Sequence, residues 1–115
     1  MKVLHVLEAI EGGTARHLRY VVRHVDAQHV VIVPAERIGG LTDTGAFDVM
    51  RAAGAEVHVV PMRRSPASRH NAAALMHVRR HIRRHRPDVV HGHSSIGGAI
   101  ARVATLGTDA ARVYT

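Results

Sequence analysis

Two histidines and two serines follow a short apolar run near the end of the chain. Residues 87–95 read Pro-Asp-Val-Val-His-Gly-His-Ser-Ser, and a helical pattern follows over residues 96–106. We interpret the segment as a buried strand that opens into a polar, imidazole-rich turn. In an open parallel α/β sheet the loop after a strand faces the ligand crevice. His93, Ser94 and Ser95 are therefore placed to bind a ligand or to act on it.

The two imidazoles allow more than one interpretation. His91 and His93 could bind a metal ion, since alternate residues of an extended segment share a side. No carboxylate or third histidine is near in the sequence, however, so we expect no metal site here. We expect His91 to point into the sheet layer as a hydrogen-bonded core residue, and His93 to face the crevice from the strand tip. A neutral imidazole there can donate to a substrate hydroxyl or orient a nucleophile.

A second candidate site follows the first apolar run of the chain. Gly12, Gly13 and Thr14 come where a helical pattern begins. Glycine permits close backbone approach, and free N–H groups at a helix start suit a phosphate or diphosphate. The same residues also suit a plain tight turn. The spacing is not that of the G-x-G-x-x-G fingerprint, and the chain has no Gly-Lys-Ser/Thr phosphate loop.

Basic side chains form two further groups. Arg63 and Arg69 lie in the loop after the expected third strand, on the crevice side, and are candidates for contact with an anionic acceptor. The helical segment 71–86 carries His77, His81 and His85 among five arginines. We interpret that stripe as a solvated basic face. Contact with anionic lipid headgroups or non-specific nucleic-acid binding are alternatives, and a zinc site is the least favoured.

Strands and helices must alternate to position these residues. Apolar runs of strand length lie at 2–7, 29–33, 56–60, after Pro87 and at 112–115, and helical patterns lie at 14–25, 46–53, 71–85 and 96–106. A β-α unit repeated four times predicts a parallel sheet with right-handed crossovers. The fold class is therefore α/β, a Rossmann-like doubly wound sheet in a three-layer α/β/α sandwich, truncated at its fifth strand.

The strand order 3-2-1-4-5 would make the first and fourth strands neighbours. Their following helices then pack on opposite faces and open a crevice between the loops. Those loops are residues 8–14 and 91–95, so the two unusual loops of the chain would meet at one place.

Composition limits the class of protein. The 115 residues suffice for one domain with a real core. A net charge of +7 implies an anionic partner. Aromatic residues make up 3%, too few for specific nucleic-acid recognition by base stacking. The chain has no cysteine, no signal-like start and no long apolar run. We expect a cytoplasmic protein, with peripheral membrane contact through the basic helix 71–86 as an option.

The motifs together resemble a known family. The glycine pair before a helix, the stretch GLTDTGAFDVMRAAGAEVHVVPM and the stretch RPDVVHGHSSIGGAIAR are similar to the N-terminal, acceptor-side domain of GT-B fold, family 4 retaining glycosyltransferases. The resemblance covers nearly all of residues 1–115. It implies a transferase, for hexosyl or related groups, that moves a sugar from a nucleotide-diphospho-sugar to a glycan, lipid-linked or small-molecule acceptor. The donor nucleotide would be held mainly by a C-terminal domain outside these residues, leaving this part inactive alone.

The resemblance also implies roles for individual residues. The backbone of Gly12 and Gly13 would approach the donor diphosphate, and His93 would contact the donor sugar as the catalytic residue. Glu11, like Glu8, lies in the loop where acceptor contacts fall. No metal or cofactor is implied, because helix N-termini and basic side chains can stabilise the departing diphosphate. The competing hypothesis is a non-catalytic α/β module that binds a phosphorylated ligand or an anionic surface.

Overall fold

Strands and helices alternate along the chain in the computed structural model, which describes residues 1–8, 12–33, 45–60 and 69–115. Within these ranges the strands are β1 (Lys2–Leu7), β2 (Gln28–Val33), β3 (Glu56–Val59), β4 (Val89–His93) and β5 (Ala111–Tyr114). The helices are α1 (Gly12–His24), α2 (Gly45–Ala52), α3 (Arg69–His85) and α4 (Ser94–Ala104). Every expected element is present, and most bounds differ by one or two residues.

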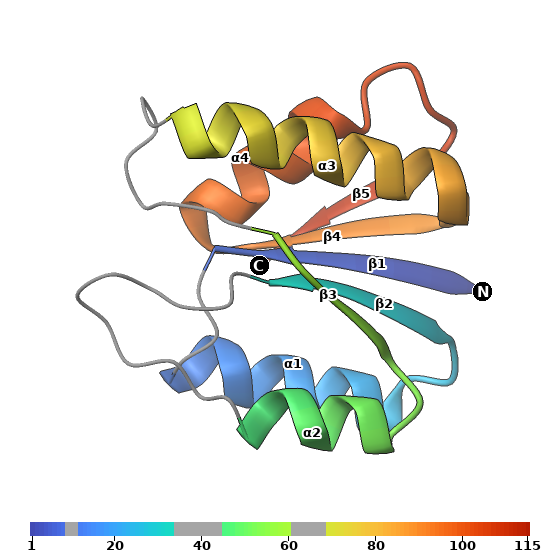
Figure 1. Ribbon diagram of the computed structural model, residues 1–115. Coiled ribbons are helices and arrows are strands. Elements are labelled where there is room, and N and C mark those ends of the chain that lie inside the picture. Colours follow the sequence, from blue (N-terminus) through green and yellow to red (C-terminus); the bar gives the residue numbers. More distant parts are fainter. Residues whose placement is uncertain (9–11, 34–44, 61–68) are drawn as a thin grey trace.

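The strands form one parallel sheet in the order β3-β2-β1-β4-β5. Helices α1 and α2 cover one face of the sheet, and α3 and α4 cover the other (Figure 1). The three-layer Rossmann-like prediction and the strand order are thus confirmed. β4 pairs with β1 on one side and with β5 on the other, so the last strand is a regular member of the sheet.

Successive residues of a strand point to opposite faces of the sheet, so the hydrophobic core has two halves, one on each face. Leu4 and Val6 of β1 pack in the cluster under α3 and α4, whereas Leu7 packs in the cluster under α1 and α2. This is the two-residue period of a strand buried on both sides. His5 lies two residues before Leu7 in β1 and therefore points to the same face of the sheet, toward α1.

The expected turn between the fourth strand and its helix does not exist. β4 ends at His93 and α4 begins at Ser94, the next residue. Ser94 makes the change of direction with a left-handed φ of 65°, a conformation that costs a non-glycine residue about 1–2 kcal/mol. After this junction α4 lies directly against the backbone of β1, since a Cβ on Gly97 would lie 2.7 Å from the Val6 carbonyl oxygen. The prediction of a polar loop over 91–95 is therefore wrong.

The stripe on α3 is only partly a solvated face. His77 is exposed, but His81 and His85 are half-buried. Arg79 donates to the carbonyl oxygens of Ala104 (3.3 Å) and Leu106 (3.0 Å) at the end of α4, where the unpaired carbonyls of a helix need donors. The basic side of α3 therefore contacts the end of α4 through Arg79, and β3 through His81 and His85 beside His58. None of the helices in the described ranges is long and apolar enough to cross a membrane.

Candidate functional site

A pocket of about 210 Å³ opens where β1 and β4 end. Its lining residues are Gly13, Thr14, His17, His93 and Thr115. Leu7, the last residue of β1, stands in register with His93, the last residue of β4, and the helices that follow these strands lie on opposite faces (Figure 1). Such a change in winding direction leaves a crevice at the carboxyl edge of the sheet. The expectation that Gly13 and His93 share this edge is confirmed.

Helix α1 begins at Gly12, two residues before the expected cap at Thr14. Both glycines therefore lie in its first turn, where backbone N–H groups have no partner within the helix. Gly13 is exposed, and a Cβ added there would meet no atom of the described residues within 4 Å. The first turn contains no acidic residue, so no side chain of that turn neutralises the positive end of the helix dipole. Contacts among the described residues therefore do not require glycine at position 13.

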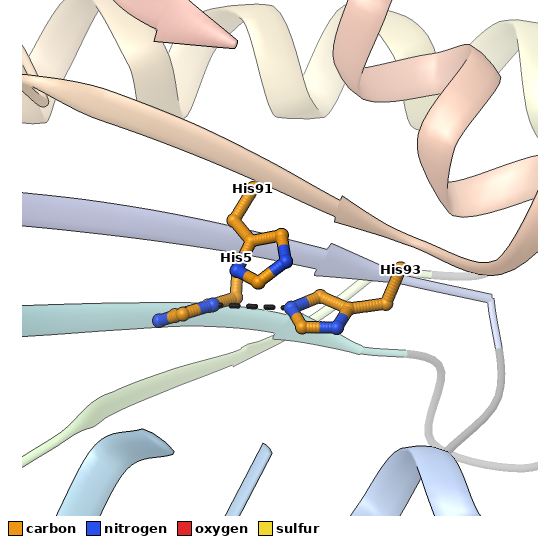
Figure 2. Close-up of side chains that lie close together, drawn as sticks. All are labelled: His5, His91 and His93. Carbon is orange, nitrogen blue, oxygen red and sulfur yellow. Dashed lines mark hydrogen bonds between the residues drawn. The ribbon is translucent and has the colours of Figure 1, made fainter. Parts of the chain in front are cut away.

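A chain of buried histidines crosses the α1 face of the sheet and reaches this pocket. His5 Nδ1 lies 3.2 Å from His93 Nε2 (Figure 2), and His5 Nε2 lies 3.0 Å from His29 Nδ1. At the far end, His29 Nε2 donates to the Val25 carbonyl at 2.9 Å. At the pocket end, the Thr115 hydroxyl lies 3.3 Å from His93 Nδ1 and 3.0 Å from His91 Nε2.

The Val25 carbonyl at one end determines which ring nitrogen donates in each hydrogen bond between these histidines. A carbonyl only accepts, so His29 must carry its proton on Nε2. With neutral rings, His29 Nδ1 then accepts from His5 Nε2–H, and His5 Nδ1 accepts from His93 Nε2–H. His93 Nδ1 is left as the acceptor of the Thr115 hydroxyl proton. The imidazole at the pocket is thus held in one tautomer by contacts that extend across three strands.

Burial keeps the rings of His5 and His93 neutral. Burial, with a smaller contribution from the neighbouring imidazoles of His93 and His91, lowers the pKa of His5 from 6.5 to about 2. Burial, together with the nearby imidazoles of His91 and His17, likewise lowers the pKa of His93 to about 3. His93 at neutral pH is therefore a hydrogen-bonding group and not a source of positive charge.

His91 is buried and hydrogen-bonded to Thr115, as expected, and His93 lines the pocket from the end of β4, but the two side chains do not point apart. Residues two apart in a strand share a face, and their ring centroids lie 3.9 Å apart. His93 is the more buried of the two, at 1% exposure against 8% for His91, although its ring still lines the pocket. A third histidine is also present, because His5 stands beside His91 in the register of β1 and β4 (Figure 2).

The carboxylate of Glu8 lies next to the junction of β4 and α4. Ser94 Oγ donates to Glu8 Oε1 at 3.5 Å. Glu8 is buried, and its Oε2 has no hydrogen-bond partner among the described residues. A buried carboxylate oxygen without a partner is costly in a folded protein.

The remaining predicted site residues are spread more widely. Ser95 is exposed in the first turn of α4 and is not in the pocket lining. Arg69 is exposed at the start of α3, also outside that lining. Glu11 and Arg63 lie outside the described residues.

Sequence reasoning missed His17 and Thr115 in the pocket, and His5 beneath it. His17 stands one helical turn after Gly13, so the spacing in α1 carried a signal for it. The signal for His5 was its place two residues before Leu7 in the same strand, which puts both side chains on one face of the sheet.

Comparison with known proteins identifies the family. The sequence model of Glycosyltransferase Family 4 matches residues 11–115. A crystal structure of a glycosyltransferase from Rickettsia africae ESF-5 superposes with a TM-score of 0.58 at 14% sequence identity, over 98% of this chain and 28% of that one. At this identity the superposition shows the shared fold, and the chain spans little more than a quarter of that structure's length. No match was found among curated proteins. The family match covers nearly the whole chain, which belongs to Glycosyltransferase Family 4.

Proposed function

We propose that this chain is the acceptor-side domain of a retaining glycosyltransferase. The enzyme would transfer a sugar from a nucleotide-diphospho-sugar to a glycan, lipid-linked or small-molecule acceptor. The observation that carries the proposal is the pocket between the start of α1 and the end of β4, which brings Gly13 and His93 together. Membership of the family supports the reaction class.

The start of α1 suits the donor diphosphate. Its free N–H groups and its positive dipole end attract phosphate oxygens, and the exposed Gly13 allows them to approach the backbone. The net charge of +7 favours the approach of an anionic substrate. In this proposal the diphosphate contacts Gly12, Gly13 and Thr14 when a second domain closes over the pocket.

His93 faces the sugar in this arrangement. Its hydrogen bonds to His5 and Thr115 fix the ring, so it supplies a neutral surface of defined orientation near the reacting carbon. In this proposal the acceptor binds near Glu8, whose Oε2 has no hydrogen-bond partner among the described residues, and near Ser94 beside it. Ser95 and Arg69 would lie at the outer part of the acceptor site.

The reaction breaks the bond between the anomeric carbon and the diphosphate oxygen. A bond from the same carbon to the acceptor oxygen replaces it on the same face, which retains the configuration. The acceptor proton passes to the departing diphosphate. Helix N–H groups stabilise the negative charge on that diphosphate as it leaves.

A bulky residue at position 13 tests this proposal. In the full-length enzyme, Gly13→Val places a branched side chain where the diphosphate approaches, so transfer should fall by more than about a hundredfold, the loss typical of one misplaced reacting group. The fold should persist, because the position is open. Steady-state kinetics over several donors measures the effect, and circular dichroism checks the fold.

Ala52→Val is the matched control, since Ala52 is exposed at the far end of α2 and should retain full activity. A companion variant, His93→Ala, should lower kcat more than it raises the donor KM if the ring acts in the transition state. Normal turnover by folded Gly13→Val enzyme would contradict the proposal. It would mean that the donor diphosphate does not approach the backbone at position 13.

A further inference from the structure

A second group of histidines lies far from the pocket, between the edge strand β3 and helix α3. His58 comes from β3, and His81 and His85 come from successive turns of α3. One ring nitrogen from each lies within 4.8 Å of one from each of the others. The ring centroids of His58 and His81 are 4.3 Å apart, and each lies 5.8 Å from that of His85.

A carboxylate completes the group. Glu56 Oε1 lies 3.4 Å from His58 Nε2, and Glu56 Oε2 lies 3.4 Å from His85 Nε2. Two ligand atoms of a tetrahedral ion bound at 2.0–2.1 Å are about 3.4 Å apart. Each of the two imidazoles therefore already stands at the separation of neighbouring zinc ligands from one oxygen of the carboxylate, His58 from Oε1 and His85 from Oε2. The rings need to move inward by less than about 1 Å each to reach a common ion.

The three imidazoles are not satisfied by one another. His58 Nε2, His81 Nδ1 and His85 Nε2 are all buried and have no hydrogen-bond partner among the described residues. A buried polar atom without a partner is uncommon and requires an explanation, of which an ion is one. The histidine chain of the pocket differs, because its ring nitrogens bond to each other, to Thr115 and to a backbone carbonyl.

The charges nearby are mixed. Arg84 and Lys2 oppose a bound cation, while the carboxylate of Glu56 favours it.

We propose that His58, His81, His85 and Glu56 bind a zinc ion that ties the edge strand β3 to helix α3. Four protein ligands make a closed site, which is typical of structural zinc. All four residues of β3 are exposed or half-buried, so apolar packing holds this edge weakly. A metal ion would supply the attachment that the side chains alone do not.

Metal titration of the purified protein tests the proposal. Chelator-stripped protein should bind one zinc ion per chain against a chromophoric competitor, and cobalt should give the visible absorption of a tetrahedral site. Saturating zinc should raise the melting temperature. His58→Gln and His81→Gln should each weaken zinc binding by at least about tenfold. Loss of a residue that only hydrogen-bonds a metal ligand already costs about that much affinity.

Two control variants locate the ion. His77→Gln removes an exposed histidine one turn before His81 on the same helix and should bind zinc as the unmodified protein does. His93→Gln removes a member of the pocket cluster and should also retain binding. Should His58→Gln or His81→Gln fail to fold by circular dichroism, Glu56→Gln at a half-exposed carboxylate provides the same test. Absence of stoichiometric binding, unchanged affinity in the cluster variants, or loss of binding in His93→Gln would each overturn the proposal.

Discussion

The buried histidines beneath the pocket should make the folded state sensitive to acid. His5 and His93 are almost fully buried and hydrogen-bonded to each other. Their pKa values are lowered from 6.5 to about 2 and about 3. As the pH falls below 6.5, the unfolded chain therefore binds protons that the folded chain cannot accept. Stability contributed by the neutral rings is present above pH 6.5 and is lost as the pH falls toward the folded values.

We predict that the free energy of unfolding decreases as the pH falls from 6.5 to about 3. The slope contributed by each proton approaches about 1.4 kcal/mol per pH unit. Urea unfolding at a series of pH values across this range measures it. His5→Gln should give a shallower slope, because glutamine does not titrate.

His77→Gln is the control for the pH slope of His5→Gln. His77 is exposed, so its replacement should leave the slope that His5 contributes. Equal slopes in His5→Gln and the unmodified protein would show that the buried pair does not control the acid sensitivity.

The contact between His5 and His93 joins residues 88 positions apart and could be only half predicted from the sequence. The alternation of side chains along a strand predicts which face of the sheet each residue occupies, and the strand order makes β1 and β4 neighbours. The register that sets His5 opposite His91, and so brings His93 within reach, depends on tertiary packing. Without it, His93 could only be placed at the edge of the sheet, as the sequence indicated.

At the scale of elements, glycines allow α4 to lie against the sheet immediately after β4. A Cβ on Gly97 would lie 2.7 Å from the Val6 carbonyl oxygen and 3.1 Å from Leu7 Cα. A Cβ on Gly92 would lie 2.6 Å from Gly98 Cα. Helix and strand backbones are thus in direct contact, which holds the ends of β1 and β4 in the geometry of the pocket.

We predict that Gly97→Ala lowers the free energy of unfolding by about 1–3 kcal/mol, the usual cost of an added methyl group in a packed core. Gly13→Ala is the matched change in another helix. Position 13 is open, so alanine there should leave stability unchanged or raise it by up to about 1 kcal/mol through helix propensity. Urea unfolding of both variants decides the matter, and equal stability in the two would contradict the close contact.

The sequence predicted the elements well because apolar runs and helical periodicity alternate clearly. Strand β1 was located at its observed bounds, and α1 within two residues. The junction of β4 and α4 was missed for a physical reason. His91 and Gly92 are untypical of a strand interior, and only their packing against β1 and α4 makes them part of one.

At the scale of the whole molecule, the pocket has walls on two sides, from the start of α1 and the end of β4. The chain covers 28% of the glycosyltransferase structure that it resembles. We propose that further walls of the pocket come from another domain of the proposed enzyme, and that a ligand that contacts this chain alone makes only part of its contacts. We expect weak binding, which the charge of +7 strengthens at low ionic strength.

Amide chemical shifts test most directly whether the pocket receives the donor. The ¹⁵N-labelled chain is titrated with several nucleotide-diphospho-sugars at moderate salt, where long-range attraction is screened. We predict weak binding, with shifts centred on the amides of Gly12, Gly13 and Thr14 and on those of His93 and Ser94, and with loss of these shifts in Gly13→Val. Two results would contradict the account: shifts confined to the basic residues of α3, or tight, salt-resistant and sugar-selective binding, which would mean that the donor site is complete within this chain.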